Sequence, residues 1–222
     1  MDGNGRWARR RRLPRIEGHR AGIKSARAAM EVCREQAIPY LTLYTFSLEN
    51  WLRPKTEVDE LMRLLLGYLG REAKRMIQNR IRFRALGRLG LLPPKVRAKV
   101  EEITAATAGN ERLNLCLALS YGGRAEIVDA INALALERAA LGTQTAPTEA
   151  DLGAHLYAPD VPPPDLMIRT SGEMRLSNFL LWEAAHARLA FVPDLWPDFT
   201  AKRFAAVLAD ERARRAAAAG EA

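Results

Sequence analysis

The sequence contains no run of apolar residues near the roughly 20 that a membrane-spanning helix needs. Its first residues, Met1–Arg12, are polar and basic and lack the apolar stretch of a secretory signal. Only two cysteines occur, Cys33 and Cys116. They lie far apart within apolar patterns, so we expect buried free thiols in a reducing compartment and no disulfide framework. These absences together predict a cytoplasmic protein.

Basic residues outnumber acidic ones, with 34 Lys and Arg against 26 Asp and Glu and a net charge of +8 at pH 7. Such a surface favours polyanions, anionic lipid headgroups or phosphorylated small molecules. The excess is concentrated at the N-terminus, where only Asp2 and Glu17 oppose a group of basic residues. That group comprises Arg6, Arg9, Arg10, Arg11, Arg12, Arg15, Arg20 and Lys24.

Helical and extended patterns alternate along the chain, and a hydrophobic content of 48% excludes general disorder. Residues 1–222 read as a single domain, with a tail at 209–222 that frays or reaches a neighbouring subunit. The alternation predicts an α/β fold in which helices cover both faces of a mostly parallel central sheet. We expect strands at 40–47, 81–86, 113–120, 165–169 and 188–192, and helices at 21–37, 58–69, 95–108, 125–141, 148–157, 179–187 and 201–219.

Four clusters of polar residues fall at or near the ends of expected strands, where ligands bind in parallel α/β sheets. The first is Asp2-Gly3-Asn4-Gly5-Arg6-Trp7. Its two glycines let the backbone N–H groups cradle phosphate oxygens, and Arg6, Arg15 and Arg20 can grip phosphate by bidentate hydrogen bonds. Asp2 beside them suits a Mg²⁺ ion that bridges carboxylate and diphosphate. The alternative is an ordinary turn at a chain end.

Two further clusters follow the next strands in the sequence. Ser47–Pro54 places small polar side chains and Arg53 after a strand, either to orient a reacting group or simply as a strand-to-helix loop. Ser120–Arg124 carries two glycines before a helix. This pattern is typical of an anion site, and a helix-packing turn explains it almost as well.

The fourth cluster is Asp165–Asn178. Arg169 and Arg175, with the Ser177 hydroxyl, can form a compact diphosphate clamp on a strand-end loop. The alternative is a solvated charged face. Two arginines six residues apart among small polar residues favour the clamp.

Taken together, these motifs resemble the cis-prenyltransferases, the undecaprenyl diphosphate synthase-like enzymes. The resemblance covers nearly the whole chain, with its motifs in the family's order and spacing. They are MDGNGRWARRRRLPRIEGHRAG at Met1–Gly22, LTLYTFSLENWLRP at Leu41–Pro54, SYGGRAEIVDA at Ser120–Ala130, DLMIRTSGEMRLSNFLLW at Asp165–Trp182 and LWPDF at Leu195–Phe199.

The resemblance implies a role for each matching residue. Asp2 would hold Mg²⁺ and assist departure of the allylic diphosphate, and Asn50 would sit near the condensing carbons with Ser47 and Trp51. The clamp of Arg169, Arg175 and Ser177 would hold isopentenyl diphosphate. The allylic diphosphate would be bound by Gly3, Asn4, Gly5, Arg6 and Arg15, with Trp7, His19 and Arg53 nearby.

The implied reaction adds isopentenyl diphosphate units to an allylic diphosphate such as farnesyl diphosphate. The product is a polyprenyl diphosphate, for example the undecaprenyl carrier of cell-wall glycans. The resemblance also implies a homodimer, transient membrane contact through the product, and an apolar channel for the growing chain. We expect Val58–Leu69, Leu41–Phe46 and Leu113–Leu119 to line that channel, although each would equally suit a plain core.

Two departures from the family pattern support an alternative. The family has an apolar strand before its first motif, whereas this sequence starts at Met1, which predicts a late start at an internal methionine. Arg188 stands where the family usually carries a metal-binding glutamate. These departures suggest, as the alternative, a catalytically impaired homologue that binds diphosphate or regulates a partner. A third hypothesis, nucleic-acid binding, rests only on the basic charge and lacks any recognisable motif, so we predict no nucleic-acid partner.

Overall fold

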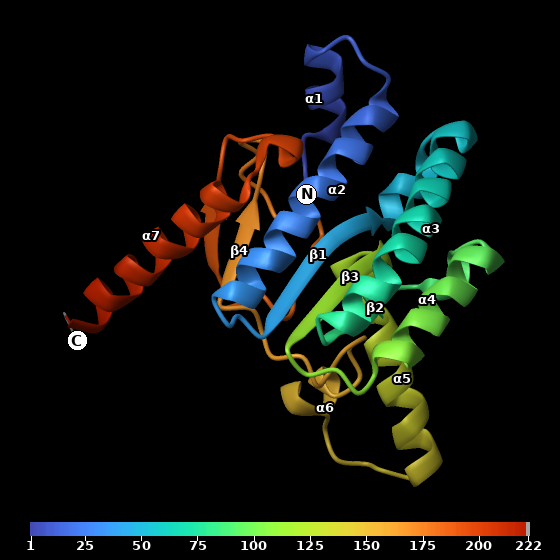
Figure 1. The fold of residues 1–222 in the computed structure, drawn as a ribbon. Helices are drawn as coiled ribbons and strands as arrows, with labels where there is room; N and C mark the ends of the chain where they lie inside the picture. Colours follow the sequence, from blue (N-terminus) through green and yellow to red (C-terminus); the bar gives the residue numbers. More distant parts are fainter. Residues whose placement is uncertain (221–222) are drawn as a thin grey trace.

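The computed structural model describes residues 1–220 as an α/β arrangement (Figure 1). No helix among these residues is long and apolar enough to cross a membrane. The strands are β1 (Tyr40–Ser47), β2 (Ile81–Leu86), β3 (Leu113–Tyr121), β4 (Leu166–Arg169) and β5 (Arg188–Phe191). The helices are α1 (Asn4–Arg10), α2 (Arg15–Glu35), α3 (Lys55–Gln78), α4 (Pro94–Thr107), α5 (Gly123–Leu141), α6 (Glu149–Gly153) and α7 (Ala201–Gly220), with short 3-10 turns η1 (Leu48–Leu52), η2 (Leu89–Leu91) and η3 (Trp196–Asp198).

All strand pairs are parallel, as the alternation of helices and strands predicted. The strands form two groups, one in the order β1-β3-β2 and one that pairs β4 with β5. All of β1 and all of β4 line one cavity, so the described residues leave the two sheets separated by open space. The strand implied before Asp2 stays a prediction.

The buried strand β3 separates two cores. Leu113, Leu115, Leu117 and Leu119 point into the larger core, which is shared with α2, α3, α4 and α7. Cys116 and Ala118 point to the opposite face and a smaller core. Successive side chains of a strand alternate between faces, so a nearly continuous apolar run supplies both cores at once. Cys33 and Cys116 are both buried free thiols, as expected.

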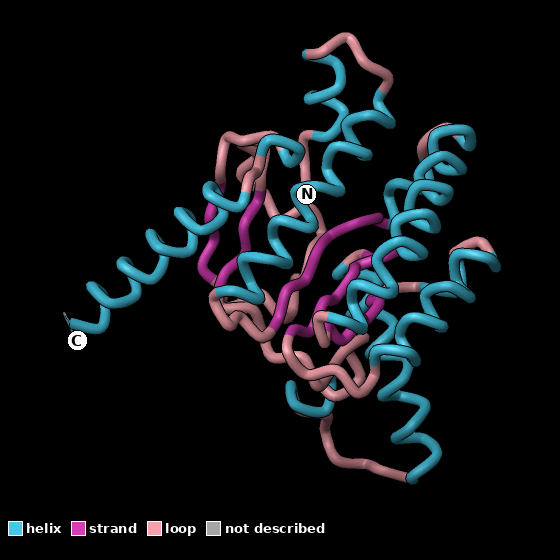
Figure 2. The backbone as a smooth tube through the Cα atoms, viewed as in Figure 1, coloured by secondary structure: helices cyan, strands magenta, loops and turns pink. Residues whose placement is uncertain are grey.

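Two expected helices differ in the structure. The helix expected at 148–157 is confined to α6 (Figure 2), and the one expected at 179–187 is absent, replaced by a series of turns. Leu180 there has a φ of 44°, outside the right-handed helical region. Apolar side chains of 179–187 are therefore packed in the smaller core by a series of turns and not by a helix. The tail is helical as far as Gly220 in α7, and its last two residues, 221 and 222, lie outside the described residues.

The close packing of α1 on α2 depends on Gly18. A Cβ added at Gly18 would lie 1.9 Å from the carbonyl oxygen of Asn4, and no flexible side chain is available to give way. We expect Gly18→Ala to lower the free energy of unfolding by about 3 kcal/mol, because the backbone of α1 must move. Chemical denaturation measures this change. As the control, Gly70→Ala on α3 meets nothing within 4 Å and should stabilise by up to about 1 kcal/mol. Equal stabilities for the two variants would contradict this account of the packing.

Candidate active site

The loops that follow β1, β3 and β4 gather with the N-terminal segment at the carboxyl ends of the strands (Figure 1). Parallel α/β sheets bind their ligands at this edge. The clusters predicted from the sequence follow these strands, and long-range hydrogen bonds connect them. Residues as distant as Asp2 and Arg169 therefore become neighbours.

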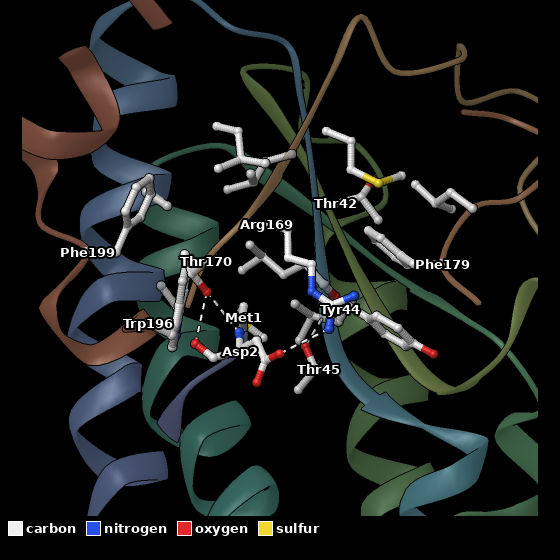
Figure 3. Close-up of a pocket in the computed structure, with 18 of the residues that line it drawn as sticks. Met1, Asp2, Thr42, Tyr44, Thr45, Arg169, Thr170, Phe179, Trp196 and Phe199 are labelled. Atoms are coloured by element: carbon white, nitrogen blue, oxygen red, sulfur yellow. Dashed lines mark hydrogen bonds and ion pairs between the residues drawn. The ribbon is translucent and has the colours of Figure 1, made fainter. Parts of the chain in front are cut away.

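Asp2 is held by its backbone, which leaves its carboxylate free to face the cavity. The backbone N–H of Asp2 donates to the Thr170 hydroxyl at 2.9 Å, and the Trp196 N–H donates to the Asp2 carbonyl at 2.9 Å. Figure 3 shows the Asp2 carboxylate pointing toward Arg169, whose Nη2 lies 3.1 Å from Oδ2. Partial burial opposes ionisation, but hydrogen bonds from Arg169 and Gly3 outweigh it and lower the pKa of Asp2 below its usual range. Asp2 is therefore a carboxylate at neutral pH.

Arg169 organises the predicted clamp. Its Nη1 donates to the Ser177 hydroxyl at 2.6 Å and also to the backbone carbonyl of Arg175. The Arg175 side chain is 64% exposed and pairs with Glu173 at 2.5 Å, so its guanidinium lies at the open side of the loop. The structure places the Ser177 hydroxyl and the Arg175 backbone against Arg169, whereas the Arg175 guanidinium pairs with Glu173, so the diphosphate clamp stays a prediction.

Arg6 connects the first and fourth clusters. It donates to the Ser171 hydroxyl at 2.6 Å and lies 3.2 Å from Glu173 and 3.8 Å from Asp2. The neighbouring Gly3, Asn4 and Gly5 all line the cavity with Arg6. Two cationic groups, Arg6 and Arg169, thus flank the Asp2 carboxylate.

Arg15 and Arg53 add further positive charge to the cavity lining, and His19 lines the cavity with them. Arg15 and Arg53 share the carboxylate of Glu57, at 3.3 and 2.8 Å. Burial, with the nearby charges of Arg53 and Arg15, lowers the pKa of His19 to about 4. His19 is thus a neutral imidazole at pH 7, and its buried Nε2 has no hydrogen-bond partner within the described chain.

The second cluster is divided between the cavity and the protein interior. Ser47 and Asn50 line the cavity, and the Asn50 side chain accepts a hydrogen bond from the Ser47 N–H at 3.2 Å. Neither Trp7 nor Trp51 is among the residues that line it. Trp7 instead donates to Asp198 at 2.7 Å, and Trp51 donates to Ser120 at 3.2 Å, so the structure places both beside the site and not in it.

The model of the Prenyltransf family, the undecaprenyl diphosphate synthase family, matches residues 1–217. The chain belongs to this family. It is 48% identical over 217 residues to the isoprenyl transferase of Heliobacterium mobile. The aligned region covers 96% of this chain and 83% of that relative. The chain is also 48% identical over 204 residues to the isoprenyl transferase of Thermotoga maritima, with 92% and 87% covered. These relatives confirm the prediction of a cis-prenyltransferase, and no comparison supports the impaired homologue.

Solved structures agree with this assignment. The lavandulyl diphosphate synthase of Lavandula x intermedia, in complex with dimethylallyl diphosphate, superposes with a TM-score of 0.90 and 32% identity, over 96% of this chain and 92% of that one. A probable undecaprenyl diphosphate synthase from Campylobacter jejuni superposes with a TM-score of 0.78 and 35% identity, over 86% and 88%. The α/β fold class with its parallel strands is thereby confirmed.

The cavity of this cis-prenyltransferase has a volume of about 1210 Å³ and leads from the cationic end into an apolar interior. Every residue of β1 lines it, and from α3 so do Leu61, Met62 and Leu65. Val58 and Leu69 of the same stripe are buried in the larger core instead. From β3 only Leu117 reaches the cavity, so the expectation that Leu113–Leu119 lines it is wrong for most of the strand, whose alternate side chains fill the two cores.

A Mg²⁺ ion fits this site only with help from phosphate. Within residues 1–220, no group of three or more His, Cys, Asp or Glu side chains is placed to hold a metal. The Asp2 carboxylate is 41% exposed at the cationic end and can contribute one oxygen ligand. Mg²⁺ commonly takes one or two carboxylates and completes its shell with phosphate and water. The residues present therefore suit a phosphate-bridged ion and not an all-protein cage.

Arg188 does not lie beside Asp2. Arg188 begins β5 and pairs with Leu166 of β4. Arg169 of β4 pairs with Phe191, three residues further along β5. That separation is about 10 Å along the strand. The Arg188 guanidinium lies 3.9 Å from Glu211 of α7 instead. Within this chain, a positive charge at position 188 therefore does not act directly on the Asp2 carboxylate.

Sequence reasoning did not single out several residues that the structure places at this site. Thr170 and Ser171 bind Asp2 and Arg6, and they could have been found because they directly follow β4. Phe179 was also missed: it stacks on Tyr44, within the predicted lining Leu41–Phe46, with the ring centroids 4.5 Å apart, and the two rings form an aromatic side of the cavity. Their pairing joins positions far apart in the sequence, and no local signal reveals it.

Glu183 also lines the cavity, next to the smaller core. One of its carboxylate oxygens, Oε2, is buried without a hydrogen-bond partner within the described chain. Burial, and then the nearby carboxylate of the fully buried Glu126, raise the pKa of Glu183 to about 7. The folded protein thus favours the neutral acid.

We expect the contribution of Glu183 to stability to fall as the pH rises from about 4.5 to about 7 and then to level off, opposite in sign to that of His19, whose lowered pKa makes its contribution rise with pH. The unfolded chain loses the Glu183 proton first, so the folded state binds more protons across this window. Glu183→Gln should remove about 2 kcal/mol of this pH dependence and be the more stable protein at pH 8. Thermal unfolding from pH 4 to pH 8 measures it. Glu60→Gln, on the exposed part of α3, should match the wild type, and identical profiles for all three proteins would contradict the assignment.

Proposed function

We propose that this prenyltransferase condenses isopentenyl diphosphate with an allylic diphosphate and so makes a polyprenyl diphosphate such as undecaprenyl diphosphate. The main support is that Arg6 and Arg169 lie on either side of Asp2 at one end of an apolar cavity, which Arg15 and Arg175 also line. Such a site can hold two diphosphates at one end and a hydrocarbon chain at the other. Dimethylallyl diphosphate, the ligand of the lavandulyl diphosphate synthase structure, is an allylic diphosphate of this kind.

In the proposed mechanism, Gly3, Asn4, Gly5, Arg6 and Arg15 bind the allylic diphosphate, with Trp7, His19 and Arg53 close by. The clamp of Arg169, Arg175 and Ser177 binds the diphosphate of isopentenyl diphosphate. Asp2 would hold Mg²⁺, which supplies positive charge to the departing diphosphate. The cationic side chains stabilise the negative charge that grows on the leaving group, and the cavity excludes water from the allylic cation.

Carbon–carbon bond formation then requires alignment of the two substrates. As the allylic C–O bond breaks and diphosphate departs, the isopentenyl double bond attacks the electron-poor carbon. The resulting cation then loses a proton to the departing diphosphate or to water, which forms the new cis double bond. Ser47, Asn50 and Trp51 are proposed to order this region. Most of the reduction in activation free energy comes from holding the reacting carbons close together. Orientation of this kind lowers the barrier by roughly 7–11 kcal/mol in model reactions.

Incorporation of labelled isopentenyl diphosphate into a farnesyl diphosphate primer tests the proposal, with and without Mg²⁺. A Mg²⁺-dependent ladder of products is expected, and its longest member gives the chain length. Folded protein that binds diphosphate but yields no product would instead favour the impaired homologue. Product without Mg²⁺ would remove the metal from the mechanism.

Arg175→Ala is expected to raise the KM for isopentenyl diphosphate by about 10- to 30-fold, with a much smaller effect on the KM of the allylic substrate. The reason is the loss of one charge-assisted hydrogen bond, about 2 kcal/mol, at an exposed site. Steady-state kinetics with each substrate varied in turn measures the effect. Arg97→Ala, an exposed arginine of α4, is the control and should leave both KM values unchanged. An effect mainly on the allylic substrate would reverse the assignment of the two sites.

The assembly and location of the protein are also proposals. We infer a homodimer from the family resemblance, supported by exposed hydrophobic side chains on α5 at Val128, Ile131 and Leu136. Light scattering tests it.

We further propose a cytoplasmic enzyme that touches the membrane through its product, with the basic N-terminal residues facing anionic headgroups. Co-sedimentation with anionic and neutral vesicles distinguishes this contact from non-specific adhesion.

A further inference from the structure

Asn178 lies where three loops of the site meet. Its Nδ2 donates to the Glu49 carboxylate, after β1, at 2.9 Å. Its Oδ1 accepts from the backbone N–H of Arg124 at 2.8 Å, and its own carbonyl accepts from the N–H of Gly123 at 2.7 Å, both at the start of α5 after β3. Asn178 itself belongs to the loop after β4. One residue thus connects the carboxyl ends of three strands.

These contacts use donors that an anion site would need. The N–H groups of Gly123 and Arg124 at the start of α5 already serve Asn178. A Cβ on Gly122 would lie 2.7 Å from Asn178 Nδ2, so a glycine is required for this approach. The two glycines of the third cluster therefore allow the loops to pack together, as the helix-packing alternative predicted.

The backbone around Asn178 is unusual. Ser177 and Asn178 have φ values of 49° and 62°, in the left-handed region, which asparagine adopts more readily than other non-glycine residues and serine seldom adopts. The conformation of Ser177 costs of order 1–3 kcal/mol and persists only where surrounding contacts hold it. Here the contacts of Asn178 hold this turn, and the turn points the Ser177 hydroxyl at Arg169, 2.6 Å away.

The Glu49 carboxylate is an effective partner for Asn178. Partial burial would raise the pKa of Glu49, but hydrogen bonds from Asn178, its own backbone and Ser47 outweigh burial and lower that pKa below its usual range. Glu49 is thus charged, and its bond from the Asn178 amide is charge-assisted. The same 3-10 turn carries Asn50, which is bonded to Ser47.

We propose that Asn178 is a positioning residue that sets the distance between the clamp of Arg169, Arg175 and Ser177 and the Ser47–Asn50 loop. The inference rests on the proposed function, in which the clamp holds isopentenyl diphosphate and the loop lies near the condensing carbons. A fixed distance between them determines whether the bound double bond reaches the allylic carbon. Misplacement by about 1 Å costs up to roughly 100-fold in rate in comparable systems.

Asn178→Asp tests this with minimal change in shape. The aspartate keeps an oxygen for the Arg124 N–H but replaces the amide donor with a carboxylate facing Glu49, so the two loops repel each other. We expect the dissociation constant of isopentenyl diphosphate, measured by calorimetry, to rise about 10-fold. The kcat should fall by about 10- to 100-fold, and the KM of the allylic substrate should change by less than about 3-fold.

The double variant Asn178→Asp with Glu49→Gln is the decisive test of the positioning role. The amide introduced by Glu49→Gln would donate to the new aspartate, which restores the hydrogen bond with its direction reversed. The dissociation constant of isopentenyl diphosphate and the kcat should then return to within about 3-fold of wild type. Asn79→Asp, the same chemical change at the end of α3, is the control and should leave the kinetics unchanged. If Asn178→Asp unfolds, Glu49→Ala at an exposed position removes the same bond without the repulsion and should show smaller changes in the same direction.

The outcomes separate the two proposals. Loss in Asn178→Asp and recovery in the double variant would support the positioning role. The positioning role would be overturned if the double variant did not recover. It would also be overturned if Asn178→Asp lost active protein without a change in the dissociation constant of isopentenyl diphosphate. Calorimetry needs no turnover, so a wild type that forms no product but still shows the loss and recovery of binding would reject the proposed function and keep the positioning role.

Discussion

The Asp2→Ala variant is expected to lose about 1,000-fold or more in kcat while keeping the unfolding temperature of the wild type within a few degrees. The carboxylate is the one acidic side chain placed between Arg6 and Arg169 in the described part of the chain, and the proposed metal depends on it. Loss of a preorganised charge at the reacting centre typically costs about 100- to 1,000-fold, and loss of the metal adds to this. Stability should change little, because the segment is held through its backbone by Thr170 and Trp196.

Asp2→Asn sharpens this test. It preserves the shape of the side chain and a hydrogen bond from Arg169 but removes the charge, so its activity should fall nearly as far. Asp59→Ala, on the exposed surface of α3, should be fully active. Activity of Asp2→Ala within about 10-fold of the wild type at saturating Mg²⁺ would remove Asp2 from the centre of the mechanism.

Arg169→Ala is expected to reduce kcat/KM for isopentenyl diphosphate by about 100- to 1,000-fold. One guanidinium, only 14% exposed, holds the Asp2 carboxylate, the Ser177 hydroxyl and the Arg175 carbonyl together. Its removal breaks several hydrogen bonds at once, each worth about 1.5–3 kcal/mol when charged. It should also raise the pKa of Asp2, since Arg169 is the main group lowering it, and so shift the acid side of the pH–rate profile to higher pH.

Arg169→Lys is the matched variant. Lysine keeps the charge near Asp2 but cannot bond Asp2 and Ser177 with a planar fork, so we expect the pH profile to recover and the KM to stay high. The pH–rate profile and the KM are therefore separate measurements of the two contacts. Wild-type kinetics in Arg169→Lys would contradict the claim that the fork geometry matters.

Much of the fold followed from the sequence. The nearly continuous apolar run 113–120 predicted a strand buried on both faces, and β3 supplies both cores as a consequence of side-chain alternation. The alternation of helices and strands predicted the parallel pairing. The arginines of the fourth cluster were found because strand ends share one edge of a sheet, and the structure gathers Arg169, Arg175 and Ser177 there.

Tertiary structure alone decided the rest. Periodicity shows which side of a helix or strand is apolar but not what covers it, so Leu61 and Leu65 could not be distinguished as cavity residues from Val58 and Leu69 in the core.

The helix expected at 179–187 failed for a related reason. Apolar spacing carries no information on backbone dihedrals, and the strained turn at Ser177–Asn178 is stabilised by partners more than 50 residues away. The chemical groups of the site, and the edge of the sheet at which they lie, could be predicted from the sequence. Their distances from one another were decided only by long-range contacts, because residues such as Asp2 and Arg169 become neighbours only when the chain folds.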